Sequence, residues 1–96
     1  MTIGVIATVT VGEGHGETFE ALFAAQAEKV RANEPGNRLY QLCRSRRTPG
    51  VYVVLELYDD DKALEAHRAS PHMAENRPKI GPLLSAPTQV EVLDAV

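Results

Sequence analysis

The chain has 96 residues and a mass of 10.5 kDa, the size of a single domain spanning residues 1–96, which excludes a two-domain enzyme. Ten Lys and Arg residues against thirteen Asp and Glu residues give a net charge of −3. That balance does not supply the basic face that a nucleic-acid-binding protein needs. A domain this short buries only about 60–65% of its unfolded surface, so a second subunit is expected to contribute to its stability.

Membrane and export signals are not evident in the sequence. No apolar run reaches the roughly 18 residues that span a bilayer. Residues 1–11 lack the positively charged start and the cleavage site of a signal peptide. The single cysteine, Cys43, has no internal disulfide partner, which suits a reducing compartment. We therefore expect a cytoplasmic protein with no membrane partner.

The first third of the chain predicts a strand followed by a helix. Apolar residues alternate along residues 1–11, as in a strand. The GEGHG run at 12–16 lacks the spacing and the Lys-Ser/Thr of a phosphate-binding loop, so it is interpreted as a turn. A 3.6-residue period then predicts a helix over 16–33, ending before Pro35. Its apolar stripe comprises Phe19, Leu22, Phe23, Gln26, Ala27 and Val30.

A β-hairpin is expected next, with strands at 38–46 and 51–58 joined by a turn that contains Pro49 and Gly50. The second strand, VYVVLELY, is largely apolar on both faces. A sheet buried on both sides needs two covers, and the helices of so small a chain supply only one. The second cover is expected to be the sheet of another copy.

The last third of the chain predicts helical structure and a closing strand. Asp59, Asp60 and Asp61 favour the start of a helix that carries Ala63, Leu64 and His67 on its apolar stripe. Ser70-Pro71 is a second start signal, and the segment after it is expected to be irregular because of Pro78, Gly81 and Pro82. Residues 88–93 read as a strand. The order β-α-β-β-α-β is that of an α+β, ferredoxin-like fold.

Metal and cofactor sites are not predicted. The available soft donors, His15, His67, His72 and Cys43, form no metal-binding motif. His67 and His72 are five residues apart, about 140° around a helix, with Ser70-Pro71 between them. A dinucleotide fingerprint is also lacking. We therefore expect neither a metal nor a flavin or nicotinamide cofactor.

Two titratable residues lie where the patterns expect apolar ones. His67 is directed inward, either as a core histidine held by a hydrogen bond or as a general base facing a pocket. Glu56 needs a partner if it is buried, and Tyr52, Tyr58, His67 or a residue of another subunit are the candidates. Glu56 shares a strand face with the tyrosines, and the pattern leaves open whether that face meets the helices.

A basic hairpin end is formed by Arg44, Arg46 and Arg47. Such a cluster is either a solvated turn or an anchor for an anionic substrate, and Tyr40 is expected near the same region.

Four segments together resemble the antibiotic biosynthesis monooxygenase family, and within it the small quinol monooxygenase-like proteins. They are LEAHRASPHM at 64–73, EPG at 34–36, YVVLELY at 52–58 and LLSAP at 83–87. The resemblance implies a ferredoxin-like monomer whose antiparallel sheet packs on that of a partner. The homodimer would be a dimeric α+β barrel with a pocket between sheet and helices in each subunit.

The same resemblance implies oxidation of a small, electron-rich aromatic substrate with O₂, without metal or flavin. In that reaction His67 would be the base and Glu56 its orienting partner. The substrate-binding residues implied are Tyr40, Tyr52, Arg44, Phe23, His72 and Met73.

This sequence departs from relatives in two places. Ala7 replaces an Asn that aromatic monooxygenases of the family carry on the first strand. Haem-degrading relatives carry a Trp and an axial His where His67 and Arg77 stand, so haem degradation is disfavoured. Two alternatives stay open: an isomerase of a small phosphorylated or carbonyl metabolite, as in relatives with a similar H-x-x-x-P-H stretch, and a non-catalytic, small-molecule-binding stress protein.

Overall fold

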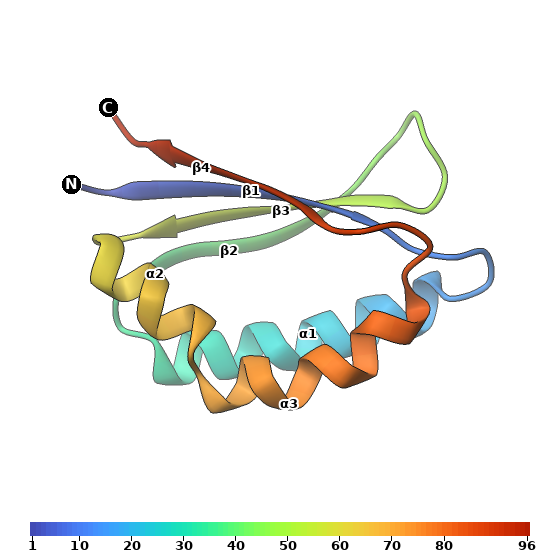
Figure 1. Ribbon diagram of the computed structural model, residues 1–96, viewed down its shortest axis with the longest axis horizontal. Coiled ribbons are helices and arrows are strands. Elements are labelled where there is room, and N and C mark those ends of the chain that lie inside the picture. The colour runs from blue at the N-terminus through green and yellow to red at the C-terminus, as the bar shows by residue number, and fades with distance from the viewer.

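The computed structural model describes residues 1–96 and shows one layer of helices against one face of a four-stranded antiparallel sheet (Figure 1). The strands lie in the order β2-β3-β1-β4. In chain order the elements are β1 (Ile3–Thr10), α1 (Gly16–Asn33), β2 (Asn37–Arg44), β3 (Val51–Tyr58), α2 (Asp61–Arg68), α3 (Pro71–Ile80), the 3₁₀ turn η1 (Gly81–Leu83) and β4 (Gln89–Asp94). This confirms the α+β ferredoxin-like prediction.

One correction concerns the second helical segment, which is two helices rather than one helix and an irregular stretch. The observed order is therefore β-α-β-β-α-α-β. The chain breaks at Ser70, whose extended backbone and side chain cap α3, and Pro71 occupies the first helical position, where its missing N–H costs nothing. Helix α3 then continues through Pro78 to Ile80.

The structure settles which face of β3 meets the helices. Alternate residues of β3 are buried on the helix side, while their neighbours along the strand point to the opposite face. The buried set is Tyr52, Val54, Glu56 and Tyr58. The paired strand β1 contributes Val5, Ala7 and Val9 to the same side, because register partners in an antiparallel pair share a face. The polar candidates are therefore directed toward the helices.

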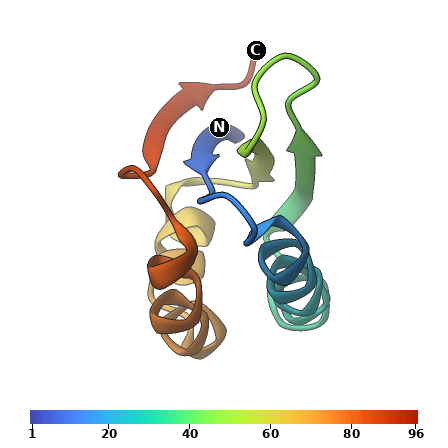
Figure 2. The same ribbon diagram turned by 90° about the vertical axis from the view of Figure 1, so that its right-hand side faces the viewer.

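The opposite face of the sheet carries no helix, as the end-on view shows (Figure 2). Its centre is nevertheless apolar, while Gln41 and Glu91 flank it on the edge strands. Leu39, Leu57, Gly4 and Leu93 are register partners in one row across the four strands, and Leu55 pairs with Ile6 in the next row. Three of these leucines, Leu39, Leu55 and Leu93, keep 38–39% of their surface exposed. A contiguous apolar surface of this kind is typical of a face that another protein surface covers.

The turn after α1 approaches α2 so closely that only glycine fits. A Cβ on Gly36 would lie 2.6 Å from the Cβ of Ala63, well inside any normal carbon contact. The Gly36 carbonyl also accepts a hydrogen bond from the backbone N–H of Asp59, at 2.9 Å. This contact brings the residues at the end of α1 against the helix that carries His67.

None of the three helices is both long and apolar enough to cross a membrane.

Ser70 is predicted to be a stability determinant. Its hydroxyl donates to the carbonyl of His67 (2.7 Å) and accepts from the backbone N–H of Met73 (3.3 Å), so it holds the break between α2 and α3. Ser70→Ala should lower the free energy of unfolding by about 1–2 kcal/mol in urea denaturation. Ser85→Ala, at an exposed serine, is the control, and equal unfolding midpoints for both variants would contradict the prediction.

Candidate functional site

A largely apolar cavity of about 500 Å³ lies between the sheet and the helices. The buried apolar residues of the core form two clusters, and the cavity wall includes members of both: Phe19 and Phe23 from the larger, and Val5 and Leu64 from the smaller. The polar side chains in the wall are Gln26, Tyr40, Glu56, His67, Arg68, Arg77 and Thr88. A cavity of this size and lining suits a small organic ligand with few polar groups.

His67 lies in the cavity wall, as its position on the helical stripe predicts. The residue is 4% exposed, and its ring packs between the aromatic rings of Tyr40 and Tyr58, with centroids 5.4 and 5.3 Å away. The imidazole is thus buried and surrounded by rings rather than by water.

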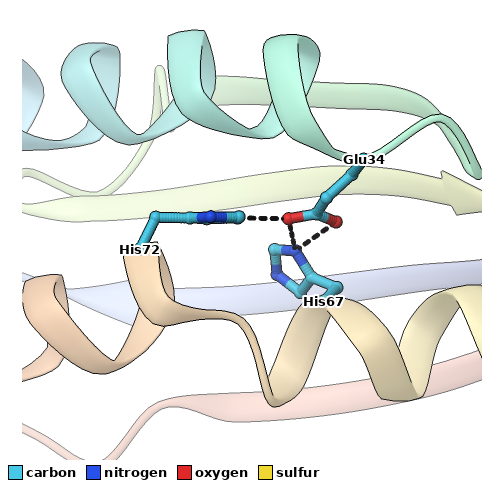
Figure 3. A group of neighbouring side chains, drawn as sticks. All are labelled: Glu34, His67 and His72. Carbon is cyan, nitrogen blue, oxygen red and sulfur yellow. Dashed lines mark hydrogen bonds and ion pairs between the residues drawn. The ribbon is translucent and has the colours of Figure 1, made fainter.

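Glu34 holds this imidazole from the side away from the cavity. Its carboxylate oxygens lie 2.9 and 3.0 Å from Nδ1 of His67, and one of them also contacts Nε2 of His72 (Figure 3). The three side chains come from the end of α1, from α2 and from the start of α3. Because an ionised carboxylate only accepts hydrogen bonds, each ring directs an N–H at it. The Glu34 side chain is 8% exposed, and these two bonds satisfy its buried charge.

This arrangement assigns the tautomer of His67. A neutral imidazole carries one proton, and Glu34 holds it on Nδ1, so Nε2 has a free lone pair. Nε2 lies 3.9 Å from Oε1 of Glu56, which is too far for a hydrogen bond. The result is an unprotonated ring nitrogen beside the cavity, backed by a carboxylate.

Glu56 lines the cavity but hydrogen-bonds elsewhere. Its Oε1 accepts from the hydroxyl of Tyr58 at 2.6 Å. Burial raises the pKa of the Glu56 carboxyl, while the Tyr58 hydrogen bond and the nearby Arg68 charge act in the opposite direction. The group that orients His67 in the structure is Glu34, which the sequence reasoning noted only within the EPG motif.

Burial also controls the charge of His67. The pKa of His67 is lowered because removal from water disfavours the imidazolium, and the hydrogen bond and charge of Glu34 oppose that effect. The ring is therefore neutral at pH 7 and able to accept a proton.

Donor atoms of Glu34, His67 and His72 all lie within 4.8 Å of one another. Two imidazoles and a carboxylate are donor types that divalent transition metals accept. In this structure both rings hydrogen-bond the carboxylate, so the cluster is satisfied by its own groups. On one continuous helix the spacing of His67 and His72 would direct the two rings apart. The break at Ser70 and the arrival of Glu34 from α1 bring the three together.

Tyr40 presents a hydroxyl donor to the cavity. Its oxygen accepts from the amide nitrogen of Gln26 at 2.5 Å, and the amide of Asn76 in turn donates to Gln26 Oε1 at 2.6 Å. Burial raises the pKa of the Tyr40 phenol, so the phenol keeps its proton. With Gln26 donating to the Tyr40 oxygen, the phenolic O–H remains available to a ligand.

The other predicted ligand contacts divide into two groups. Phe23 and Met73 line the cavity with Tyr40, and Ala7 lies in its wall. Arg44, Tyr52 and His72 do not line it. Arg44 forms two hydrogen bonds with Glu20, at 2.9 and 2.7 Å, and Tyr52 donates to the same carboxylate at 2.6 Å. His72 lies behind Glu34 and lines a second, outer hollow.

Two cations in the cavity wall, Arg68 and Arg77, were not singled out as ligand contacts from the sequence. A signal for Arg77 was present: Met73, Arg77 and Ile80 follow the i, i+4, i+7 spacing of one helix face, and all three line the cavity. The arginine occupies a position where that face is otherwise apolar.

Comparison with known proteins gives consistent matches. A family model described as "Antibiotic biosynthesis monooxygenase" matches residues 2–78. The "Putative monooxygenase Rv0793" of Mycobacterium tuberculosis is 36% identical over 91 residues, covering 95% of this chain and 88% of that protein. Its solved structure has a TM-score of 0.90 at 33% identity, covering 100% of this chain and 96% of that one. A "putative antibiotic biosynthesis monooxygenase" from Caulobacter crescentus CB15 has a TM-score of 0.97 at 42% identity, covering 99% and 90%.

The titration of His67 provides a direct test of the Glu34 contact. We expect nuclear magnetic resonance to give His67 a pKa below 6.5 because the ring is buried. In Glu34→Gln the pKa should fall further, since the carboxylate that favours the imidazolium is gone. Glu28→Gln, at an exposed position of α1, should leave the pKa unchanged. A His67 pKa that does not respond to Glu34→Gln would show that the two groups are not coupled in solution.

Proposed function

Because the chain belongs to the antibiotic biosynthesis monooxygenase family, we propose that it is a cofactor-independent monooxygenase that oxidises a small quinol or polyphenol with O₂. The observation that carries the proposal is the unprotonated Nε2 of His67 beside an apolar cavity, with Glu34 behind the ring. The family match and the two relatives described as monooxygenases support the broader monooxygenase-like assignment.

In this reaction the substrate is its own reductant. His67 Nε2 accepts the proton of a substrate hydroxyl, and the resulting phenolate is a stronger electron donor to O₂ than the phenol. One oxygen atom enters the ring and the other leaves as water. For hydroquinone the balance is hydroquinone plus O₂ giving hydroxybenzoquinone plus water, with all four electrons from the substrate. The imidazolium then returns its proton to the departing reduced oxygen.

Proton transfer is uphill and needs help from the site. A phenol pKa of roughly 10 against a histidine of roughly 6.5 leaves a deficit of about 5 kcal/mol. The lowered pKa of His67 increases that deficit. Two groups are placed to offset it: Glu34 stabilises the imidazolium, and the Tyr40 hydroxyl donates a hydrogen bond to the phenolate. The positive charges of Arg68 and Arg77 in the cavity wall also favour an anion in the cavity, without direct contact with the phenolate.

Oxygen consumption is the test of this function. Protein treated with a chelator should take up O₂ with at least one member of a hydroquinone panel. His67→Ala should lower the rate by about 10²-fold or more, the usual contribution of a general base. His15→Ala, at an exposed histidine in the β1–α1 turn, is the matched control and should retain full activity.

Three outcomes would contradict the proposal. Equal rates in wild type and folded His67→Ala would remove His67 from the mechanism. Turnover of a carbonyl substrate under argon, without quinol oxidation in air, would favour an isomerase. Saturable binding without product would favour a binding protein.

A homodimer formed through the outer face of the sheet completes the proposal. That face presents apolar residues that no helix covers, among them Leu39, Leu55 and Leu93. Burying it against a second sheet would shield the strands that form the cavity floor from water on their far side.

Replacing one residue of that face should separate the subunits. Light scattering at micromolar concentration should give twice the 10.5 kDa chain mass for the wild type, and 10.5 kDa for Leu55→Glu, because a charge would be buried at the interface. Ala66→Glu, on the exposed side of α2, adds the same charge as a control and should remain dimeric. A monomeric wild type would refute the homodimer.

A further inference from the structure

We propose that the cavity binds an aromatic ligand that carries an anionic oxygen group, a carboxylate or a phosphate, and that Arg77 and Arg68 hold that group at the cavity mouth. The identity of the oxidised ring rests on the proposed function. The anion site itself rests on the two arginines and is testable by binding alone.

Arg77 is fixed on the cavity side of α3. It lies between Met73 and Ile80 on the face that lines the hollow, and its Nη2 donates to the backbone carbonyl of Arg68 at 2.6 Å. That carbonyl belongs to the last residue of α2. The bond ties the guanidinium to the end of the helix that carries His67 and leaves its other N–H groups without an ion-pair partner. A guanidinium held through one nitrogen can still bind a carboxylate or a phosphate through its remaining N–H groups.

Neither Arg68 nor Arg77 forms an ion pair with a carboxylate within 4.0 Å. Other arginines of the chain do: Arg38 pairs with Asp59 at 2.6 Å and Arg44 with Glu20 at 2.7 Å. The chain as a whole carries a net charge of −3. Two cations without an ion-pair partner therefore make the charge at this part of the cavity positive. An anion attracted here is recognised by this corner and not by the overall field of the protein.

The two charges act on the groups inside the cavity. Arg77 contributes to lowering the pKa of His67, and Arg68 contributes to lowering the pKa of the Glu56 carboxyl. Arg77 is therefore within electrostatic reach of the base, and Arg68 is within reach of Glu56, whose Oε1 lies 3.9 Å from Nε2 of His67. A ligand whose anionic group meets them would place its ring in the apolar part of the hollow, next to His67.

Only one carboxylate, Glu56, lines the cavity, and it is engaged by the Tyr58 hydroxyl. The remaining wall is mostly apolar, with Phe19, Phe23 and Val54 among its members. A cavity wall that is mostly apolar, with two cations in one part of it, fits an amphiphilic ligand better than a neutral quinol or a fully polar sugar.

Isothermal titration calorimetry under argon, which prevents turnover, tests the proposal with three probes. They are hydroquinone, 2,5-dihydroxybenzoate and 4-hydroxyphenyl phosphate. We expect at least one anionic probe to bind about ten-fold more tightly than hydroquinone, and the double variant Arg68→Gln/Arg77→Gln to lose that advantage. Arg77→Lys retains a charge without the fork, so it should preserve phosphate binding better than carboxylate binding.

Arg46→Gln/Arg47→Gln is the matched control, because it removes two charges from the β2–β3 hairpin, outside the cavity. It should leave all three affinities unchanged. Hydroquinone binding as tightly as both anions, no probe binding, or an equal loss in the control double variant would each overturn the proposal.

The anion site and the proposed function can fail separately. Anion binding that needs Arg68 and Arg77, in a protein that consumes no O₂, would support the anion site and refute the proposed function. Oxygen uptake by a protein that binds the anions no more tightly than hydroquinone would support the proposed function and refute the anion site.

Discussion

The structure depends on how one buried carboxylate is satisfied. Glu34 lies just past the end of α1, in a turn that Gly36 allows to approach α2, and it is almost fully removed from water. A charge in that position is tolerated only if donors surround it, and the donors are His67 and His72 from two successive helices. The same contact therefore ties three helices together and determines which nitrogen of His67 remains free to react.

The chemistry available to the cavity follows from that assignment. A ring held through Nδ1 presents Nε2 to a largely apolar cavity, and burial keeps the ring neutral. A developing anion then needs stabilisation, and the groups of the wall suited to it are Tyr40, Arg68 and Arg77. These groups come from three elements, with Tyr40 on β2, His67 and Arg68 on α2 and Arg77 on α3, so the site exists only in the packed domain. Fold alone does not define activity, and this arrangement of groups is what distinguishes the candidate site.

Much of this was accessible from the sequence because the elements have clear periods. The helical spacing placed His67 inward, and Ser70-Pro71 marked the second helix start, both as observed. Strand alternation put Glu56 with the tyrosines but gave no means of telling which face meets the helices, since both faces are apolar. Glu34 could not be assigned its role, because its partners lie 33 and 38 residues away and no local pattern links them.

Arg68 shows the same limit, since its sequence position is that of a solvated side chain. Arg77, by contrast, shares the helical spacing of Met73 and Ile80. The basic hairpin cluster instead favours Arg44, which pairs with Glu20. The most direct measurement of the central claim is the protonation pattern of the His67 ring, from long-range ¹H–¹⁵N spectra at pH 7.5. We predict a neutral ring with its proton on Nδ1 and a bare Nε2. A ring protonated on Nε2, or one whose tautomer is the same in Glu34→Ala, which removes the acceptor, would show that Glu34 does not prepare this histidine as a base.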